Sequence, residues 1–158
     1  MSTVFLLKML LYRISKCTYI NDLSGTGARL YGGRWNNIGR PMVYMASTRS
    51  LAVLEVLVHL SPTNIPDDFC QITFDVPNDV QVLDVNTLPV NWQDYPEPTA
   101  LKAMGDAFLK QNKHLLLKVP SAIIKEEFNY LLNPAHPKAH LVKIVEQKEF
   151  TFDERLLV

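Results

Sequence analysis

The chain has 158 residues, of which 47% are hydrophobic and 20% charged, a balance typical of an ordinary globular domain. Sixteen basic residues cancel sixteen acidic ones, so the formal net charge is zero. Broad binding to nucleic acid or to a membrane surface needs a positive field, and this neutrality argues against both. It also leaves little charge to keep chains apart, so association with a partner is expected. We expect a single domain over residues 1–158.

The chain begins with an apolar stretch, residues 1–12, that has to be distinguished from a signal peptide. Lys8 interrupts it, no small-residue cleavage site follows, and it is too short to span a bilayer. We interpret it as a buried first strand or helix leading into Arg13, in a cytoplasmic protein. Cys17 and Cys70 could form one bridge, but without a secretion signal the sequence favours two reduced thiols.

Residues 21–41 carry five of the six glycines, interleaved with aromatic and aliphatic residues. Glycine allows close backbone approach, so this segment is predicted to be a long structured loop beside something that must come close. Arg29 and Arg34 lie within it, and arginine suits pyrophosphate or carboxylate groups. The residues leave two interpretations open: a phosphate or other anion site, or a structural cluster of turns with one buried arginine ion pair.

A short strand over 41–45 is followed by capping residues and an apolar run over 51–60, which predicts a helix. Apolar side chains surround its axis, so the helix is expected to be buried on nearly all sides. Glu55 lies within it, and a buried carboxylate is costly unless it is paired or used. The candidates are a salt bridge to Arg13 or Arg34, or a role in the chemistry.

The remaining pattern predicts mostly strands, close together in sequence, and therefore an α+β fold with a mixed, largely antiparallel sheet. Strands are expected over 69–76, 80–85, 114–119, 128–132, 141–146 and 149–152, with a loop over 88–98 and a helix over 99–111. His136 and His140 are four apart but separated by Pro137, so no metal site is predicted.

Several short motifs, in order over residues 11–137, together resemble the RES-domain toxins of RES–Xre toxin–antitoxin pairs. Each motif is weak alone, and together they are specific. They are Leu11-Tyr-Arg13, Gly25-Thr-Gly-Ala28, Gly32-Gly-Arg-Trp-Asn36, Gly39-Arg-Pro-Met-Val-Tyr44, Ser50-Leu-Ala-Val-Leu-Glu-Val-Leu-Val-His59, Val119-Pro-Ser121 and Asn129-Tyr-Leu-Leu-Asn-Pro134.

The resemblance implies an ADP-ribosyltransferase-like fold, in which a split sheet grips NAD⁺, and an activity that degrades NAD⁺ by cleaving its nicotinamide–ribose bond. NAD⁺ is then the substrate and no cofactor is needed; water or inorganic phosphate is the acceptor, giving an NAD glycohydrolase or an NAD phosphorylase. The matching positions imply Arg34, Tyr44 and Glu55 as catalytic residues and Arg13, Gly33, Arg34, Tyr44 and Ser121 as NAD-binding residues.

This chemistry fits the residue types. Nicotinamide leaves as a neutral base from a cationic ring and generates an oxocarbenium-like ribose, which the Glu55 carboxylate can stabilise. Arg13 and Arg34 suit the pyrophosphate. Tyr44 offers an aromatic surface for nicotinamide, and Ser121 can bond to ribose, to phosphate or to Glu55.

Two other functions stay open. An ADP-ribosyltransferase acting on a macromolecule would use the same site; such enzymes often carry a further acidic residue just before the catalytic glutamate, whereas Val53 and Leu54 stand here. The third interpretation is a non-catalytic module that binds a protein or a nucleotide. The resemblance also implies a partner, an Xre-like helix-turn-helix antitoxin that blocks the cleft within an oligomeric complex and makes the DNA contacts itself. Delivery as a secreted effector stays open.

Overall fold

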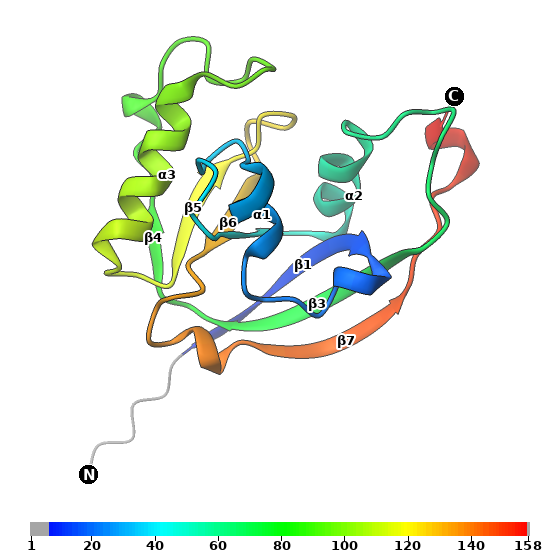
Figure 1. Ribbon diagram of the computed structural model, residues 1–158, viewed down its shortest axis with the longest axis horizontal. Coiled ribbons are helices and arrows are strands. Elements are labelled where there is room, and N and C mark those ends of the chain that lie inside the picture. Colours follow the sequence, from blue (N-terminus) through cyan, green and yellow to red (C-terminus); the bar gives the residue numbers. More distant parts are fainter. Residues whose placement is uncertain (1–6, 158) are drawn as a thin grey trace.

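The computed structural model describes residues 7–157, which form one seven-stranded sheet with three α-helices (Figure 1). The strands are β1 (Lys8–Lys16), β2 (Val43–Ala46), β3 (Phe69–Pro77), β4 (Val80–Val82), β5 (Leu116–Pro120), β6 (Phe128–Leu132) and β7 (Lys143–Glu149). The helices are α1 (Thr26–Tyr31), α2 (Arg49–Leu57) and α3 (Thr99–Gln111). Within the described part of the chain, no helix has the length and apolar character needed to cross a membrane.

The sheet has the strand order β4-β5-β6-β2-β1-β3-β7, and only β4 and β5 run parallel. Between β1 and β2 the register contains one pair, Tyr12 with Ala46, whereas β1 pairs with β3 along its whole length. The sheet therefore splits at this point into β4-β5-β6-β2 and β1-β3-β7. The predicted α+β class with a mixed, largely antiparallel split sheet is confirmed.

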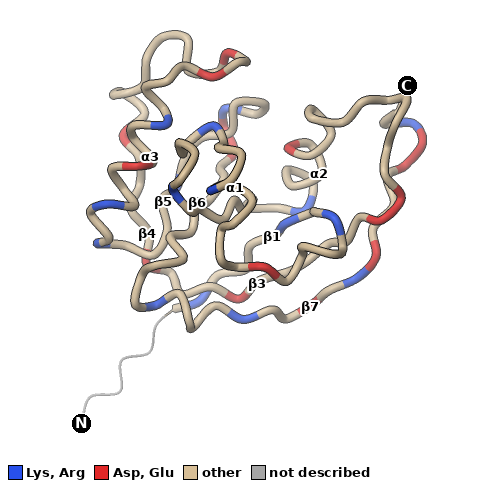
Figure 2. Tube along the Cα trace, viewed as in Figure 1, with Lys and Arg blue, Asp and Glu red and all other residues tan. Residues whose placement is uncertain are grey.

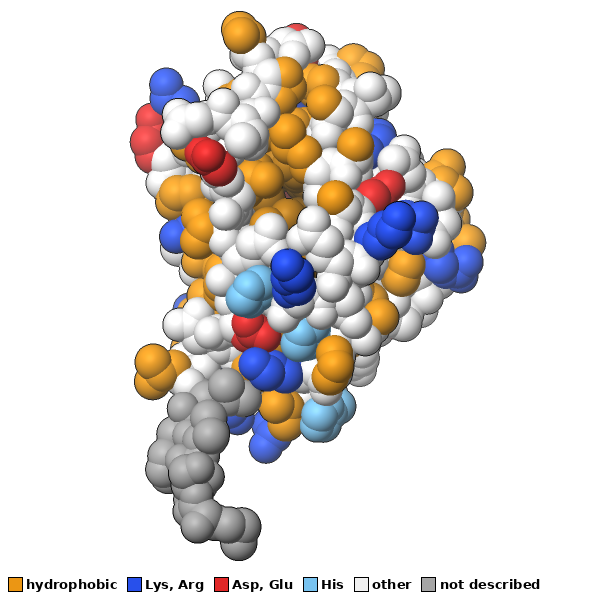
Figure 3. Space-filling view, turned by 90° about the vertical axis from the view of Figure 1, so that its left-hand side faces the viewer, with side chains coloured by type: hydrophobic (Ala, Val, Ile, Leu, Met, Phe, Trp, Pro, Cys, Tyr) orange, Lys and Arg blue, Asp and Glu red, His pale blue; other side chains and the backbone are white. Residues whose placement is uncertain are grey.

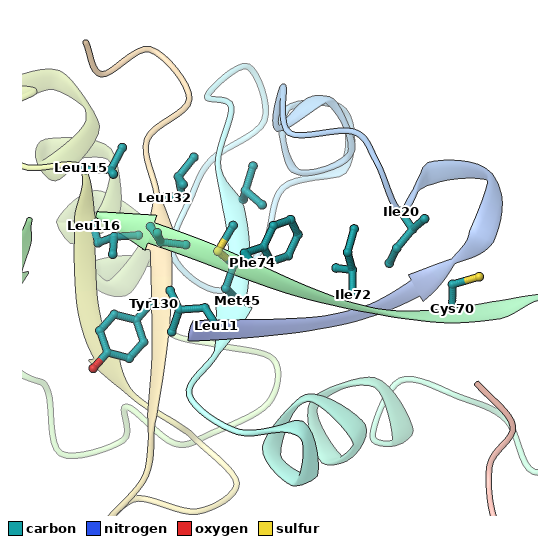
Figure 4. Close-up of a cluster of buried hydrophobic side chains, with 12 residues drawn as sticks. Leu11, Ile20, Met45, Cys70, Ile72, Phe74, Leu115, Leu116, Tyr130 and Leu132 are labelled. Carbon is teal, nitrogen blue, oxygen red and sulfur yellow. The ribbon is translucent and has the colours of Figure 1, made fainter. Parts of the chain in front are cut away.

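The largest core cluster joins the two parts of the sheet. Leu11 on β1 and Phe74 on β3 share it with Met45 on β2 and Leu132 on β6 (Figure 4). All four side chains are at most 2% exposed. A second cluster lies beneath α3 and a third beneath α2. Basic and acidic residues both occur on the strands and on the helices (Figure 2), and in the full sequence their numbers are equal.

Two segments of the structure differ in detail from what the sequence predicts. The 21–41 segment is not only loop, because it contains the short helix α1. The helix α2 is less enclosed than its composition suggests: Leu51 and Ala52 are buried, but Val58 just after it is 57% exposed and His59 is exposed. It packs one side on the sheet and leaves its C-terminal end in solvent, so the expectation that it is buried on nearly all sides is wrong.

The C-terminal segment also departs from the prediction. One strand, β7, replaces the two expected over 141–146 and 149–152. It is an edge strand bonded to β3, and every residue of it is exposed. Both faces of β7 therefore meet solvent, and its apolar residues Ile144 and Val145 are exposed.

Cys17 and Cys70 form a disulfide bond, so the expectation of two reduced thiols is wrong. The cause is the pairing of β1 with β3, which sets Ser15 opposite Cys70. Cys17 comes just after the end of β1, and its Cα lies 4.8 Å from that of Cys70. The bond ties the segment that follows β1 to the start of β3.

Asp79, just before the start of β4, is contacted by basic side chains. Its carboxylate lies 2.7 Å from His114 Nδ1 and 3.1 Å from Lys138 Nζ. Figure 3 shows histidine side chains beside acidic and basic ones on the face that α3 and β4 present. Burial by itself would raise the pKa of the Asp79 carboxyl, but the hydrogen bonds from His114 and Lys138 outweigh it and hold that pKa below its ordinary value.

We expect Asp79→Asn to lower the free energy of unfolding at pH 7 by about 1–3 kcal/mol, because charged hydrogen bonds are lost. A carboxyl whose pKa is depressed by folding contributes stability above its unfolded pKa, about 3.9, and loses that contribution as the pH falls through the folded value. The difference from wild type should therefore shrink below about pH 4. Urea unfolding at pH 7 and pH 3 measures it, with the exposed Asp67→Asn as control. A difference that stays constant between these pH values would contradict the linkage.

Candidate active site

Glu55 lies on α2, whose first turn is capped by Thr48: its Oγ1 accepts a hydrogen bond of 3.1 Å from the Leu51 amide. The carboxylate is half-buried. Ser121 Oγ and Asn129 Nδ2 each donate to Glu55 Oε1 at 2.8 Å. Within residues 7–157, no ion pair joins Glu55 to Arg13 or Arg34, so the expected salt bridge is wrong; two neutral donors take its place.

The strand register brings this carboxylate close to the split in the sheet. Asn129 on β6 pairs with Ala46 on β2, and Ala46 pairs with Tyr12 on β1. Neighbouring strands lie about 5 Å apart, so Asn129 and Tyr12 are about 10 Å apart across this row. Arg13 directly follows Tyr12, at the point where β1 and β2 separate.

A cleft of about 410 Å³ opens beside this row, within the size range of small-molecule sites. It is lined by β1, the turn after it, α1 and β2, with Arg13, Ser15, Asp22, Thr26 and Tyr44 supplying polar groups. Arg13 Nη1 donates to the Asp22 carbonyl oxygen at 3.0 Å. Burial lowers the pKa of Arg13 from its ordinary value, and the Asp22 charge opposes this. The guanidinium stays protonated because arginine is so strongly basic.

Tyr44 stands at the inner wall of the cleft and fixes the segment that follows α1. Its hydroxyl donates to Asn36 Oδ1 at 2.6 Å and accepts from the Trp35 amide at 3.0 Å. Gly33 lies so close that a Cβ there would stand 2.5 Å from the Tyr44 hydroxyl oxygen, which explains why a residue without a side chain occupies this position. Burial raises the pKa of Tyr44, so the hydroxyl stays neutral at physiological pH.

Arg34 and Arg13 have different hydrogen-bond partners. Its Nη1 donates to the Trp92 carbonyl at 2.9 Å and its Nη2 to the Asp94 carbonyl at 3.2 Å, so the guanidinium holds the predicted loop 88–98. Arg29 is exposed on α1. Of the predicted site residues, Arg13 and Tyr44 line the cleft, whereas Gly33, Arg34, Glu55 and Ser121 are not among its lining residues. NAD binding by Arg13, Gly33, Arg34, Tyr44 and Ser121 stays a prediction, as do the catalytic roles of Arg34, Tyr44 and Glu55.

Sequence reasoning missed several polar residues that build this region. Asn129, which holds Glu55, falls within a motif that carried the resemblance but was not singled out. Lys102 on α3 donates to the Gly33 carbonyl oxygen and lies 2.9 Å from Glu97, both being largely buried. The hydrogen bond from Lys102 is the main cause that holds the pKa of Glu97 below its ordinary value. The exposure of these side chains is set by tertiary packing, so their spacing in sequence carried no signal.

We expect Tyr44→Phe to destabilise the protein by about 1–3 kcal/mol, because the Trp35 amide and Asn36 Oδ1 each lose a partner in a largely buried place. The aromatic ring, and with it the packing against Leu131 and its neighbours, is retained. Thermal unfolding measures the loss, and Tyr31→Phe on the exposed side of α1 is the matched control. Equal melting temperatures for the two variants would show that the Tyr44 hydroxyl does not hold this segment.

Comparison with known proteins places the chain in a family. Residues 10–153 match the RES domain. The chain is 42% identical over 152 residues to the protein named Toxin Res of Photorhabdus laumondii subsp. laumondii, covering 94% of this chain and 97% of that one. It is also 38% identical over 141 residues to the Prs ADP-ribosylating toxin of Sphingobium sp., covering 87% of this chain and 88% of that one.

A solved structure has a similar fold. The structure superposes on a chain in the crystal structure of the M. tuberculosis MbcT–MbcA toxin–antitoxin complex with a TM-score of 0.75, covering 96% of this chain and 88% of that chain. The two share 19% sequence identity, so this likeness speaks for the fold. On the strength of the domain match and the sequence relatives, the chain belongs to the RES-domain family of toxins.

Proposed function

We propose that this protein is the toxin of a toxin–antitoxin pair and that it degrades NAD⁺ by cleaving the nicotinamide–ribose bond. The observation that carries the proposal is the Glu55 carboxylate, held at one oxygen by Ser121 and Asn129, together with a cleft that Arg13 lines with a positive charge. A fixed carboxylate and a cleft arginine suit a substrate with a cationic ribosyl centre and an anionic pyrophosphate.

In the proposed reaction the bond between ribose C1 and the nicotinamide nitrogen breaks, and nicotinamide takes the bonding electron pair. Positive charge develops on the ribose, and Glu55 stabilises it electrostatically. An oxygen of water then bonds to C1 and releases one proton to solvent; with inorganic phosphate as acceptor, a phosphate oxygen forms that bond instead. The products are nicotinamide with ADP-ribose or with ADP-ribose-1″-phosphate.

Other residues are assigned supporting roles in this proposal. Arg13 binds the pyrophosphate from within the cleft. Tyr44 supplies a neutral aromatic surface for nicotinamide at the inner wall, and Gly33 lets the backbone of this segment approach it. Arg34 keeps the loop 88–98 in place through Trp92 and Asp94, and could reach substrate only by exchanging those carbonyl partners.

The test is incubation of the purified protein with NAD⁺, with and without inorganic phosphate, followed by chromatography of the products. Nicotinamide with ADP-ribose means hydrolysis, and ADP-ribose-1″-phosphate means phosphorolysis. Intact NAD⁺ under both conditions would refute the proposed activity.

A second candidate, ADP-ribosylation of a macromolecule, is favoured by the name of the Sphingobium relative, an ADP-ribosylating toxin. The same cleavage would then deliver ADP-ribose to a protein side chain. Incubation with labelled NAD⁺ and a bacterial lysate separates the two candidates: label retained on protein after denaturing electrophoresis supports transfer, whereas label recovered wholly as small molecules supports degradation.

The proposed antitoxin partner is Xre-like and acts in the bacterial cytoplasm by covering the cleft. Support comes from the fold neighbour, which was solved in complex with its antitoxin. Co-expression with the product of a neighbouring antitoxin gene should relieve growth arrest, and arrest that persists with that partner bound would argue against this role.

A further inference from the structure

We propose that Asn129 is a positioning residue of the active site: it fixes Glu55 Oε1 jointly with Ser121, so that Oε2 is the oxygen presented to the ribosyl centre. This inference rests on the proposed function for its catalytic meaning, and on the hydrogen bonds of the structure for its geometry.

The two oxygens of Glu55 have different surroundings. Oε1 accepts from both Ser121 Oγ and Asn129 Nδ2 at 2.8 Å. Oε2 has no hydrogen-bond partner among residues 7–157. The buried side-chain atoms that lack a partner in this part of the chain are Gln71 Nε2 and Thr73 Oγ1, so Oε2 is accessible to solvent. One oxygen is therefore anchored and the other is available to a ligand.

Two backbone amides set the direction of the Ser121 hydroxyl group. Ser121 is fully buried, and its Oγ accepts hydrogen bonds of 3.1 Å from the Ile123 and Ile124 amides. These two donors occupy the lone pairs, so the hydroxyl proton points to Glu55. Ser121 is thus committed to the carboxylate, which argues that it acts through Glu55 and not by direct contact with NAD⁺.

Asn129 is held just as firmly. It lies on β6 between two bonded neighbours, paired with Val119 on β5 and with Ala46 on β2. Its amide therefore approaches Glu55 from a strand fixed on both edges, while Ser121 follows directly on β5. Two donors, one on β6 and one directly after β5, meet one oxygen of a helix residue and set the carboxylate's orientation before substrate arrives.

The test uses Asn129→Ala, the near-isosteric Asn129→Asp, and the exposed Asn78→Asp as matched control. For NAD⁺ cleavage we expect Asn129→Ala to lower kcat by about 10- to 100-fold, since small misplacements of a catalytic group cost up to about 100-fold. KM for NAD⁺ should change little, because the cleft lining is untouched. Asn129→Asp should be impaired at neutral pH and recover relative to Asn129→Ala as the pH falls, because a protonated aspartic acid can donate to Oε1.

A second readout is independent of activity. In a double-mutant cycle of urea unfolding, the loss of midpoint caused by Asn129→Ala should be markedly smaller in a Glu55→Ala background, since the partner is already gone. Additive losses, or an unchanged kcat in Asn129→Ala, would overturn the positioning role. If the wild-type protein leaves NAD⁺ intact, the proposed function fails, and the cycle still decides whether Asn129 holds Glu55.

Discussion

Glu55→Gln should lower NAD⁺ cleavage by about 100- to 1,000-fold, the cost typical of removing one electrostatic contact to a transition state. The amide keeps the shape of the side chain but lacks the negative charge that the ribosyl cation requires. Ser121 and Asn129 can still donate to its oxygen, so the fold should survive. Initial rates of nicotinamide release measure the effect.

Glu126→Gln is the matched control, because Glu126 is an exposed glutamate in the turn between β5 and β6. Its rate and its melting temperature should equal those of the wild type. A Glu55→Gln protein that is folded and retains full activity would remove Glu55 from the catalytic site, whatever acceptor the reaction uses.

Gly105→Ala should destabilise the protein at the upper end of the range of about 1–3 kcal/mol that overpacking costs. Gly105 is buried in the middle of α3, and a Cβ there would stand 1.7 Å from the Trp35 carbonyl oxygen and 2.7 Å from its carbonyl carbon. Both are backbone atoms and cannot swing aside as a side chain could. The helix would have to move off the second core cluster, and with it the segment that carries Gly33 to Asn36.

At Gly27 the same change from glycine to alanine is expected to have the opposite effect on stability. Gly27 lies on α1, and a Cβ there would meet nothing within 4 Å. Because alanine favours helix over glycine, the change should be neutral or stabilise by up to about 1 kcal/mol. Urea unfolding of the two variants is the measurement, and equal midpoints would show that α3 does not pack on Trp35 as closely as described.

The elements that were predicted well are those whose own pattern is strong. The helix over 99–111 and the strand over 128–132 have the predicted limits, since each carries a clear start or turn signal and a regular apolar face. The helix α1 was missed because it is short and contains a glycine. Its first residues follow Gly25 at a positive φ of 73°, and the Gly39 amide donates to the Arg29 carbonyl at 2.7 Å, so a later part of the chain closes its end.

The sequence predicted which residues belong to the candidate site better than it predicted how they are arranged. Glu55 stood out because a carboxylate in an apolar helix needs a partner, and the resemblance supplied Ser121. Ser121 had three expected partners, namely ribose, phosphate and Glu55. That it bonds to Glu55, and that Asn129 joins it, 66 and 74 positions away, depended on β6 and the end of β5 coming within hydrogen-bond reach of Glu55. No local pattern encodes such a distance.

The neutral charge, the α+β class, the family resemblance and the choice of Glu55 as a candidate site residue could all be read from the amino-acid sequence, because composition, periodicity and motifs act at short range. The tertiary structure alone decided that Arg13 lines the cleft while Arg34 holds the loop 88–98, and that Cys17 meets Cys70. These outcomes follow from strand pairing and from the single Tyr12–Ala46 pair at which the sheet splits. Contacts between residues far apart in the chain arise when burial and backbone hydrogen bonding are satisfied for the whole fold at once, and that condition separates two arginines that look alike in sequence.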